Sequence, residues 1–380
     1  MASKSEAAEA RHVLVCAGER ADELIALFGW AVRCFFEPRD IVSVIYARTE
    51  TVQLMVRCCE PRRLSTQSRA RSLPATAELK PTPGIGAQAS SRVLHSDSPD
   101  WFPPALAAQL DGVGFAKPPR FLELISDLSP GDALVEFLER ATVSQPDVVL
   151  LGTRGYTGLR RFLVGSTSSA VVESEAARSC LVVRRSLRHA TCGAQQPEEE
   201  ASADITTPAR DHGRVVAIAV DGSSAGMALV LYCRQFLLRA TDKVFVVHGR
   251  PDTAKTDDEL TATDVAIAAV NAAVAALHQM RDELLVAPCA ALLAEGNVRD
   301  ELVNWVESSD VDVLVVGSRG LGNALKRAVM GSVSSYAVQH AGCAVLVVSA
   351  PTLKALAQAE AAKAAEEPMP QQQQDTAEVH

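Results

Sequence analysis

Aromatic residues make up only 4% of this 380-residue chain, and several familiar targeting patterns are missing from it. With so few aromatic side chains, the cores must be built from Val, Leu, Ile and Ala, which fits the ordinary 48% hydrophobic content. No run approaches the roughly 20 apolar residues of a transmembrane helix. The N-terminal segment MASKSEAAEAR contains Glu and lacks an apolar stretch, so it resembles neither a signal peptide nor a transit peptide. We therefore expect a cytoplasmic protein with no membrane partner.

The nine cysteines form no Cys-x-x-Cys pair, which argues against a redox motif or a zinc ribbon. Most lie within apolar runs, as Cys16, Cys180 and Cys233 do, and this predicts buried thiols in a reducing compartment. The net charge of −9 and the pI near 5.5 disfavour binding to nucleic acid or to anionic membranes.

Sequence signatures of strong catalysis are also missing. The chain has no GxxxxGK[ST] phosphate loop, no His-Glu-x-x-His zinc motif and no Gly-x-Ser-x-Gly nucleophile elbow. No nucleophile and base are placed at a recognisable spacing. We expect a binding protein rather than an enzyme; slow ATP hydrolysis, which needs only a water near bound phosphates, stays open.

Two copies of one glycine-spaced segment are the most informative feature present. Residues 147–169 read DVVLLGTRGYTGLRRFLVGSTSS, and residues 312–335 read DVLVVGSRGLGNALKRAVMGSVSS. Each passes from an apolar β-branched run through Gly-x-x-Gly and a basic stretch to Gly-Ser. That order indicates a strand that ends beside a helix start, where free backbone N–H groups favour an anion such as a nucleotide phosphate.

The pattern around both copies predicts a duplicated α/β fold with two tandem five-stranded parallel sheets, because apolar strands alternate with helical segments. We place the N-terminal domain at residues 10–188, a linker at 189–212, the C-terminal domain at 213–350 and a tail at 351–380. Residues 59–119 are rich in Arg, Ser and Pro, and we expect a mostly disordered insertion there. The predicted C-terminal strands are 214–220, 243–248, 285–293, 311–316 and 344–348, and the predicted helices 225–240, 261–284, 298–308 and 333–339.

The residues of the C-terminal copy suggest specific roles. Gly317 and Gly320 let the backbone turn sharply and approach a ligand. Gly331 precedes a helix start, where Ser332 and Ser334 add hydroxyl donors. Basic side chains from Arg319 onward supply countercharge. At the end of the first strand, Asp221 can accept hydrogen bonds from a base or ribose, or help to hold a divalent cation through water.

These motifs resemble the G-x-x-G-x9-G-[ST] signature of the universal stress protein (UspA-like) family, over both halves of the chain without the insertion, linker and tail. The resemblance implies a Rossmann-like sheet related to the adenine nucleotide alpha hydrolase-like fold, with pairing through the last strand, either between the two domains or in a homodimer. It also implies a site for ATP or AMP, with or without Mg²⁺. The nucleotide contacts that it implies are Asp221, Gly249, Val316, Gly317, Gly320, Gly331, Ser332, Val333 and Ser334.

Each copy departs from the family pattern in one respect. The N-terminal copy keeps the spacing of Gly152, Gly155 and Gly165-Ser166, but its first strand ends at Ala17-Gly18-Glu19 without an aspartate in register. The C-terminal copy has Asp221 but carries one extra residue between its second and third glycines, which we expect to bulge near Gly322-Asn323.

We therefore expect the nucleotide in the C-terminal domain and a nucleotide-responsive role in stress response. Two alternatives remain: a scaffold for protein partners that binds no nucleotide, and a weak ATPase.

Overall fold

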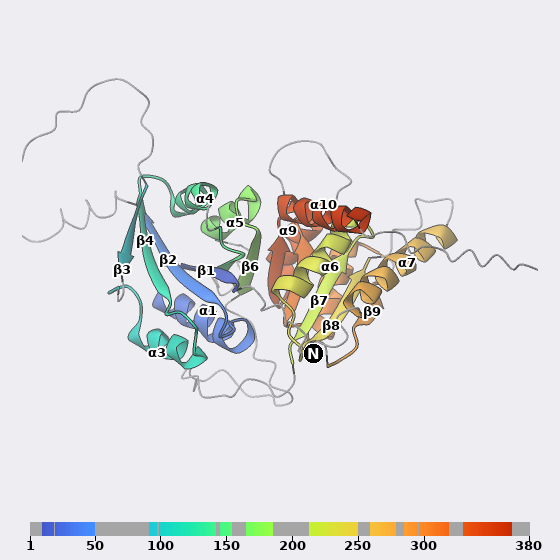
Figure 1. Cartoon of the computed structure of the whole chain (residues 1–380), viewed down its shortest axis with the longest axis horizontal. Helices are drawn as coiled ribbons and strands as arrows, with labels where there is room; N and C mark the ends of the chain where they lie inside the picture. The colour runs from blue at the N-terminus through green and yellow to red at the C-terminus, as the bar shows by residue number, and fades with distance from the viewer. Residues whose placement is uncertain are drawn as a thin grey trace, which may run out of the picture.

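The protein has a Rossmann-like α/β fold in which one mostly parallel sheet runs through both halves of the chain (Figure 1). The computed structural model describes residues 10–18, 20–49, 91–96, 99–141, 145–153, 165–184, 213–249, 259–278, 285–294, 296–318 and 330–366. Within these residues, eleven strands are ordered β3-β4-β2-β1-β5-β6-β11-β10-β7-β8-β9. In the same ranges, no helix combines the length and the apolar character needed to cross a membrane.

The N-terminal domain contains the first six strands. In the sheet, β1 lies between β2 and β5. The parallel strands of this domain are apolar runs, and they are buried because helices cover both faces of the sheet. In chain order the elements are β1 (His12–Ala17), α1 (Ala21–Cys34), β2 (Ile41–Thr49), β3 (Arg92–Ser96), α3 (Pro104–Val113), β4 (Arg120–Ser126), α4 (Pro130–Arg140), β5 (Val148–Thr153), α5 (Ser166–Ser174) and β6 (Ser179–Arg184).

The C-terminal domain repeats this plan with five strands, as predicted. Its elements are β7 (Val215–Val220), α6 (Ser224–Phe236), β8 (Lys243–His248), α7 (Glu259–His278), β9 (Cys289–Leu292), α8 (Val298–Ser308), β10 (Val313–Gly317), α9 (Ser332–His340), β11 (Ala344–Val348) and α10 (Ala350–Glu366). The predicted strand at 285–293 is shorter in the structure, because Leu285 and Val286 are exposed ahead of β9.

The expectation of a mostly disordered insertion was partly wrong. Inside the expected insertion, β3 pairs antiparallel with β4, and Leu106 and Leu110 of α3 are buried, so the stretch from residue 91 onward is part of the domain. The start of the expected tail forms α10, which packs along α6 through the buried Leu353. Apolar residues at helical spacing account for the two helices, α3 and α10. Residues 59–90, the predicted linker and the end of the tail lie outside the described residues.

The predicted buried thiols are present. Cys16, Cys180 and Cys233 are free and buried, and burial raises the pKa of Cys180 to about 12. These thiols contribute to the core and are poor nucleophiles near neutral pH.

The two domains join through their last strands. β6 pairs antiparallel with β11, with Leu181 opposite Leu346 and Ser179 opposite Val348. Pairing through the last strand, which the resemblance implied, thus occurs within one chain. The hydroxyl of Tyr232 on α6 adds a contact across the boundary, since it lies 2.8 Å from the Ser179 hydroxyl and donates to the Asp147 carbonyl at 3.1 Å.

Two buried arginines, each directly before the first strand of its domain, link the domains at the edge of the sheet where β1 and β7 begin. Arg11 bonds Asp40 in its own domain at 2.7 Å and donates to the Phe236 carbonyl of the other domain, also at 2.7 Å. Arg214 repeats this arrangement, with Asp242 at 2.6 Å and the Cys34 carbonyl of the N-terminal domain at 2.8 Å. Each guanidinium therefore neutralises a buried carboxylate and also caps the carbonyl end of a helix in the opposite domain.

We expect Arg214→Ala to lower the free energy of unfolding by about 3–5 kcal/mol, because it leaves the carboxylate of Asp242 buried without its partner. Urea unfolding followed by circular dichroism measures the change. Arg299→Ala, at an exposed position on α8, is the control and should change stability by less than about 0.5 kcal/mol. Equal stability of the two variants would contradict a structural role for the Arg214 bonds.

Candidate functional site

The sequence-predicted residues gather where the strands of the C-terminal sheet end. β10, β7 and β8 are parallel neighbours, and Val220 lies opposite His248 in their register. The residues that follow these strands therefore line one edge, with about 4.8 Å between adjacent strands. The chain leaves β7 toward β8 on one side, while β10 lies on the other, so this edge is the switch point in strand order where α/β sheets bind ligands.

Asp221 is held in a tight turn at the centre of that edge. Its Oδ1 accepts hydrogen bonds from the Ser223 amide at 3.0 Å and from the Ser223 hydroxyl at 2.5 Å. The next residue, Gly222, has φ +75, a conformation that side chains rarely adopt. Gly226 comes so close beneath the carboxylate that a Cβ there would lie 3.0 Å from Asp221 Oδ1. Asp221 itself is exposed, so a fixed carboxylate faces outward.

Gly249 lies directly after β8, the next strand along the edge. A Cβ at this position would lie only 2.6 Å from Cγ1 of Val298, the first residue of α8. The missing side chain lets α8 begin tightly against the end of β8. The backbone of Gly249 stays at the edge next to Asp221, where the resemblance places it, but Val298 fills the space on its side-chain side.

The start of α9 supplies backbone donors. Gly331 is its N-cap, and within the described residues no side chain caps this helix, whereas Ser223 caps α6 and Asn297 caps α8. The first bond of the helix runs from the Ser335 amide to the Gly331 carbonyl, so the three preceding amides have no partner within the helix. They belong to Ser332, Val333 and Ser334, and Ser332 is exposed.

Ser334 plays a second part that the sequence did not suggest. Its buried hydroxyl donates to the carbonyls of Ser318 and Gly331, at 3.1 and 3.2 Å. The Gly331 amide donates to the same Ser318 carbonyl at 2.6 Å. These bonds hold the start of α9 against Ser318 at the tip of β10. The two ends of the glycine loop, which we define as residues 318–331, therefore lie together. Donation from the Ser334 hydroxyl to a nucleotide stays a prediction.

Ser318 is a site residue that sequence reasoning missed, because it occupied a variable position of Gly-x-x-Gly. It is 1% exposed, and its hydroxyl donates to Oε1 of Glu175 in the N-terminal domain at 2.8 Å. No periodicity or spacing reports a contact between residues so distant in the chain. The other predicted residues of the loop, Arg319 and Gly320, lie outside the described residues.

The two copies differ at the strand tip. In the N-terminal copy the Ser168 hydroxyl donates to the carbonyl of Gly152. In the C-terminal copy the glycine that corresponds to Gly152 is Gly317, but the Ser334 hydroxyl donates to the carbonyl of the next residue, Ser318. The extra residue of the C-terminal copy is thus accompanied by a one-residue shift of the carbonyl that this serine bonds. The bulge predicted near Gly322-Asn323 lies outside the described residues.

The N-terminal copy also places its carboxylate differently. Gly18 stands at the end of β1, where Asp221 stands at the end of β7, as the sequence indicated. Glu23, in the first turn of α1, reaches back so that its Oε2 lies 3.3 Å from the position of a Gly18 Cβ. Glu23 Oε1 lies 3.7 Å from Nε of the exposed Arg20.

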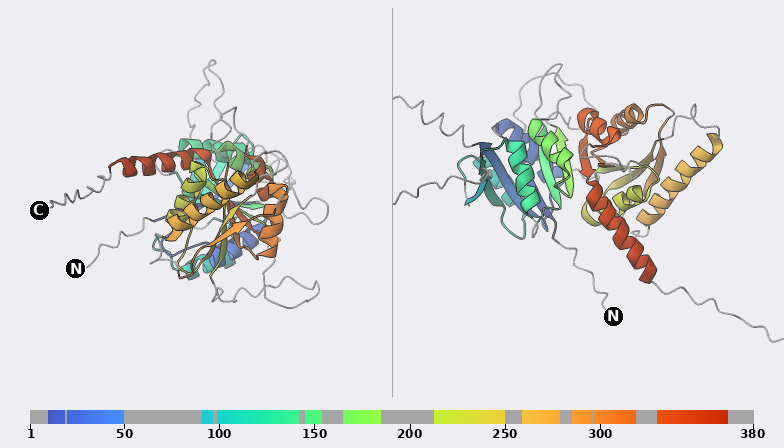
Figure 2. Two further views of the ribbon diagram at one scale, coloured as in Figure 1. Left: turned by 90° about the vertical axis from the view of Figure 1, so that its right-hand side faces the viewer. Right: turned by 90° about the horizontal axis from the view of Figure 1, so that it is seen from above.

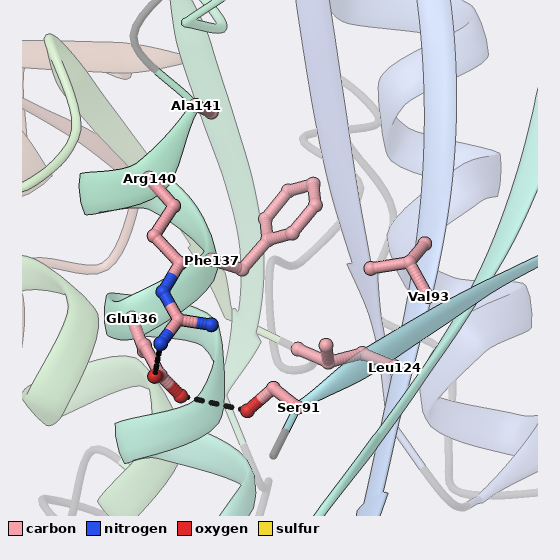
Figure 3. Close-up of a pocket in the computed structure, with 7 residues that line it drawn as sticks. All are labelled: Ser91, Val93, Leu124, Glu136, Phe137, Arg140 and Ala141. Atoms are coloured by element: carbon pink, nitrogen blue, oxygen red, sulfur yellow. Dashed lines mark hydrogen bonds and ion pairs between the residues drawn. The ribbon is translucent and has the colours of Figure 1, made fainter. Parts of the chain in front are cut away.

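A hollow of about 230 Å³ lies elsewhere in the N-terminal domain, between α4 and the β3–β4 edge (Figure 3). Val93, Leu124 and Phe137 face it from its apolar side. Its polar groups bond one another, since Glu136 accepts from Ser91 at 2.7 Å and pairs with Arg140. This hollow is a packing gap with satisfied polar atoms rather than a continuation of the glycine-lined edge. In the described ranges, no group of three His, Cys, Asp or Glu side chains could hold a metal ion.

Comparison with known proteins places the repeated segments in one family. The profile of the Universal stress protein family matches residues 124–184 and 213–349. A universal stress protein A-like protein of Arabidopsis thaliana is 38% identical over 60 residues, which cover 16% of this chain and about a third of that protein (34%).

A solved structure of the family shares the fold. A universal stress protein from Archaeoglobus fulgidus covers 90% of this chain and 99% of its own, with 13% identity and a TM-score of 0.51. A universal stress family protein of Arabidopsis thaliana, solved with AMP bound, covers 36% of this chain and 91% of its own, with 20% identity and a TM-score of 0.28.

We expect Gly249→Ala to destabilise the protein by about 1–3 kcal/mol, because the new methyl group would overlap Val298. Adding Val298→Ala should recover part of that loss, and a double-mutant cycle in urea measures the coupling. Strictly additive effects would contradict the close approach of α8 to the end of β8.

Proposed function

Because the chain belongs to the universal stress protein family, we propose that it binds ATP or AMP at the edge of its C-terminal sheet and responds to nucleotide in a stress-related role. The single observation that carries the proposal is the arrangement at this edge. A fixed, exposed carboxylate lies at the end of β7, and the amides of α9, which no described side chain caps, begin beside the end of the neighbouring β10. One solved family member holds AMP, which is a property of that protein.

The chemistry of an adenine nucleotide fits these two groups. A carboxylate accepts hydrogen bonds from ribose hydroxyls or from the amino group of the base, and Asp221 is held ready by Ser223. The amides of Ser332, Val333 and Ser334 present the positive end of α9 to phosphate oxygens. A bound triphosphate would bring negative charge, and the protein would supply hydrogen-bonding groups rather than a reactive group. Mg²⁺ bound to the phosphates would be held near Asp221 through water molecules.

The helix carrying these amides is held by neighbouring side chains. The hydroxyl of Tyr336 on α9 donates to Asp300 of α8, and this bond raises the pKa of Tyr336. The Tyr336 ring stacks on His340 with 3.9 Å between ring centres. A pre-organised helix start lowers the entropic cost of ordering donors around a phosphate.

The alternatives differ in what they predict for nucleotide. A scaffold for protein partners would give no heat on titration with Mg-ATP. A weak ATPase would bind nucleotide and also release phosphate continuously. We propose a binding protein rather than an enzyme, because the sequence carries no phosphate-loop, zinc or nucleophile-elbow motif. Phosphate release abolished by Asp221→Ala would favour the ATPase instead.

We expect Asp221→Ala to weaken Mg-ATP binding about tenfold or more, since a hydrogen bond to a charged group is worth about 1.5–3 kcal/mol. Isothermal titration calorimetry measures the affinity. The matched control is Asp111→Ala, which removes an exposed carboxylate from α3 of the other domain and should bind like the unmodified chain. Equal affinity of both variants would place the nucleotide elsewhere.

A second variant tests the phosphate contact. Ser332 is the first residue of α9, where proline is tolerated, and Gly331 before it has φ −59 and ψ 152, which suit a residue preceding proline. Ser332→Pro therefore removes one amide donor while leaving the helix intact. We expect about tenfold weaker Mg-ATP binding at an unchanged melting temperature. Ser332→Ala keeps the amide and serves as control. If Ser332→Pro binds as tightly as Ser332→Ala, the amide at this position does not contact phosphate.

A further inference from the structure

The Ser318 side chain connects three segments at the tip of β10. Its hydroxyl donates to Glu175 Oε1 at 2.8 Å and accepts from the Ala350 amide, the first residue of α10, at 2.9 Å. Its carbonyl receives the Gly331 amide and the Ser334 hydroxyl, and its amide donates to the Val348 carbonyl at 2.7 Å. A single buried residue thus joins the glycine loop, the start of α9, the start of α10 and the other domain.

Glu175 reaches Ser318 from an unusual backbone conformation. It ends α5 with φ 56, in the left-handed region that residues other than glycine rarely adopt. Such a conformation persists when surrounding contacts determine it, and it is often found at functional positions. Here it directs a carboxylate across the domain boundary. The views in Figures 1 and 2 show α5 and β6 lying beside α9 and α10 at that boundary.

Only the N-terminal domain supplies a carboxylate to the other domain at this position. Ala341 ends α9 where Glu175 ends α5, and its methyl group offers no acceptor. Thr153 takes the place of Ser318, since Gly152 and Gly317 pair with equivalent residues of the last strands. The N-terminal domain therefore supports the loop of the C-terminal domain without a matching side-chain contact in return at this position.

A second side chain of the N-terminal domain holds the far end of α9. Arg184, at the end of β6, donates to the Val338 carbonyl in the last turn of α9 at 3.0 Å. A cation at this end complements the helix dipole, whose positive end is the proposed phosphate site. Burial lowers the pKa of Arg184, against the raising influence of Cys343 and Glu307. Both ends of α9 are thus fixed by contacts that trace back to the N-terminal domain.

We infer that Glu175 is a positioning residue for the C-terminal nucleotide site, acting through Ser318, so that nucleotide binding and the pairing of the two domains are thermodynamically coupled. This inference rests on the proposed function. The amides at the start of α9 face phosphate correctly only when Ser318, which bonds Gly331 and Ser334, is in place, and Glu175 adds the N-terminal domain's contact to the bonds that hold Ser318. By linkage, a nucleotide that requires this arrangement also tightens the boundary.

Two substitutions at Glu175 separate positioning from stability. Glu175→Gly leaves the buried Ser318 hydroxyl without this acceptor but also relieves the left-handed backbone, and because these two effects oppose each other the melting temperature should change little. Its affinity for Mg-ATP should fall about fivefold or more. Glu175→Gln keeps an acceptor oxygen for Ser318 and should restore most of the affinity. Arg178→Ala is the matched control, because its side chain bonds Asp147 within its own domain at the same boundary.

The experiment is calorimetric titration of Mg-ATP into the full chain and these three variants, with amide hydrogen exchange of residues 175–184 before and after nucleotide. We expect nucleotide to slow exchange there in the unmodified chain and in Arg178→Ala, and not in Glu175→Gly. Binding by Glu175→Gly at the unmodified affinity overturns the coupling while leaving the proposed function standing. Equal weakening of all three variants also overturns it. No binding by the unmodified chain overturns both proposals.

Discussion

The antiparallel pairing of β6 with β11 is the constraint on which the rest of this structure depends. Each domain alone would end in an apolar strand with one unpaired edge, a costly and aggregation-prone surface. Joined edge to edge, the two strands satisfy each other's backbone groups and bury Leu181 against Leu346. The buried arginines then fix the angle of the union, because each bonds helix-end carbonyls in both domains.

That pairing also determines which parts of the two domains meet. Because β6 and β11 run in opposite directions, the end of β11 lies opposite the start of β6, with Val348 across from Ser179. The turn between α5 and β6 therefore lies beside the strand tips of the C-terminal sheet. A parallel union would have placed that turn at the other end of β11. The contact between Glu175 and Ser318 is thus a consequence of strand direction.

The sequence was sufficient to predict the elements whose pattern is local. Lys243–His248 and Ala344–Val348 match their predicted bounds, and Val298–Ser308 does so as a helix, because uninterrupted apolar runs and an Asn cap define them. It failed where stability comes from distant partners. β3 has four exposed residues in five, and only β4 beside it reveals a strand. Likewise Glu175 and Gly249 gain their roles from Ser318 and Val298, contacts that no sequence spacing encodes.

The comparison of the two β–α turns shows how duplication allowed the copies to diverge. In the C-terminal turn a short aspartate stands on the strand and a glycine lies in the helix beneath it. In the N-terminal turn the glycine stands on the strand and a longer glutamate rises from the helix. Both arrangements fill the same space with one carboxylate, since a side chain at each position would collide.

The two carboxylates differ in how firmly they are held. Asp221 has few rotamers and accepts two bonds from Ser223, whereas Glu23 has an additional torsion and faces Arg20 at 3.7 Å. Rotamer entropy and the nearby cation both reduce the ability of Glu23 to act as a fixed acceptor. The same fold therefore holds one carboxylate fixed by two bonds from a neighbouring serine and another that is less fixed and lies beside a cation.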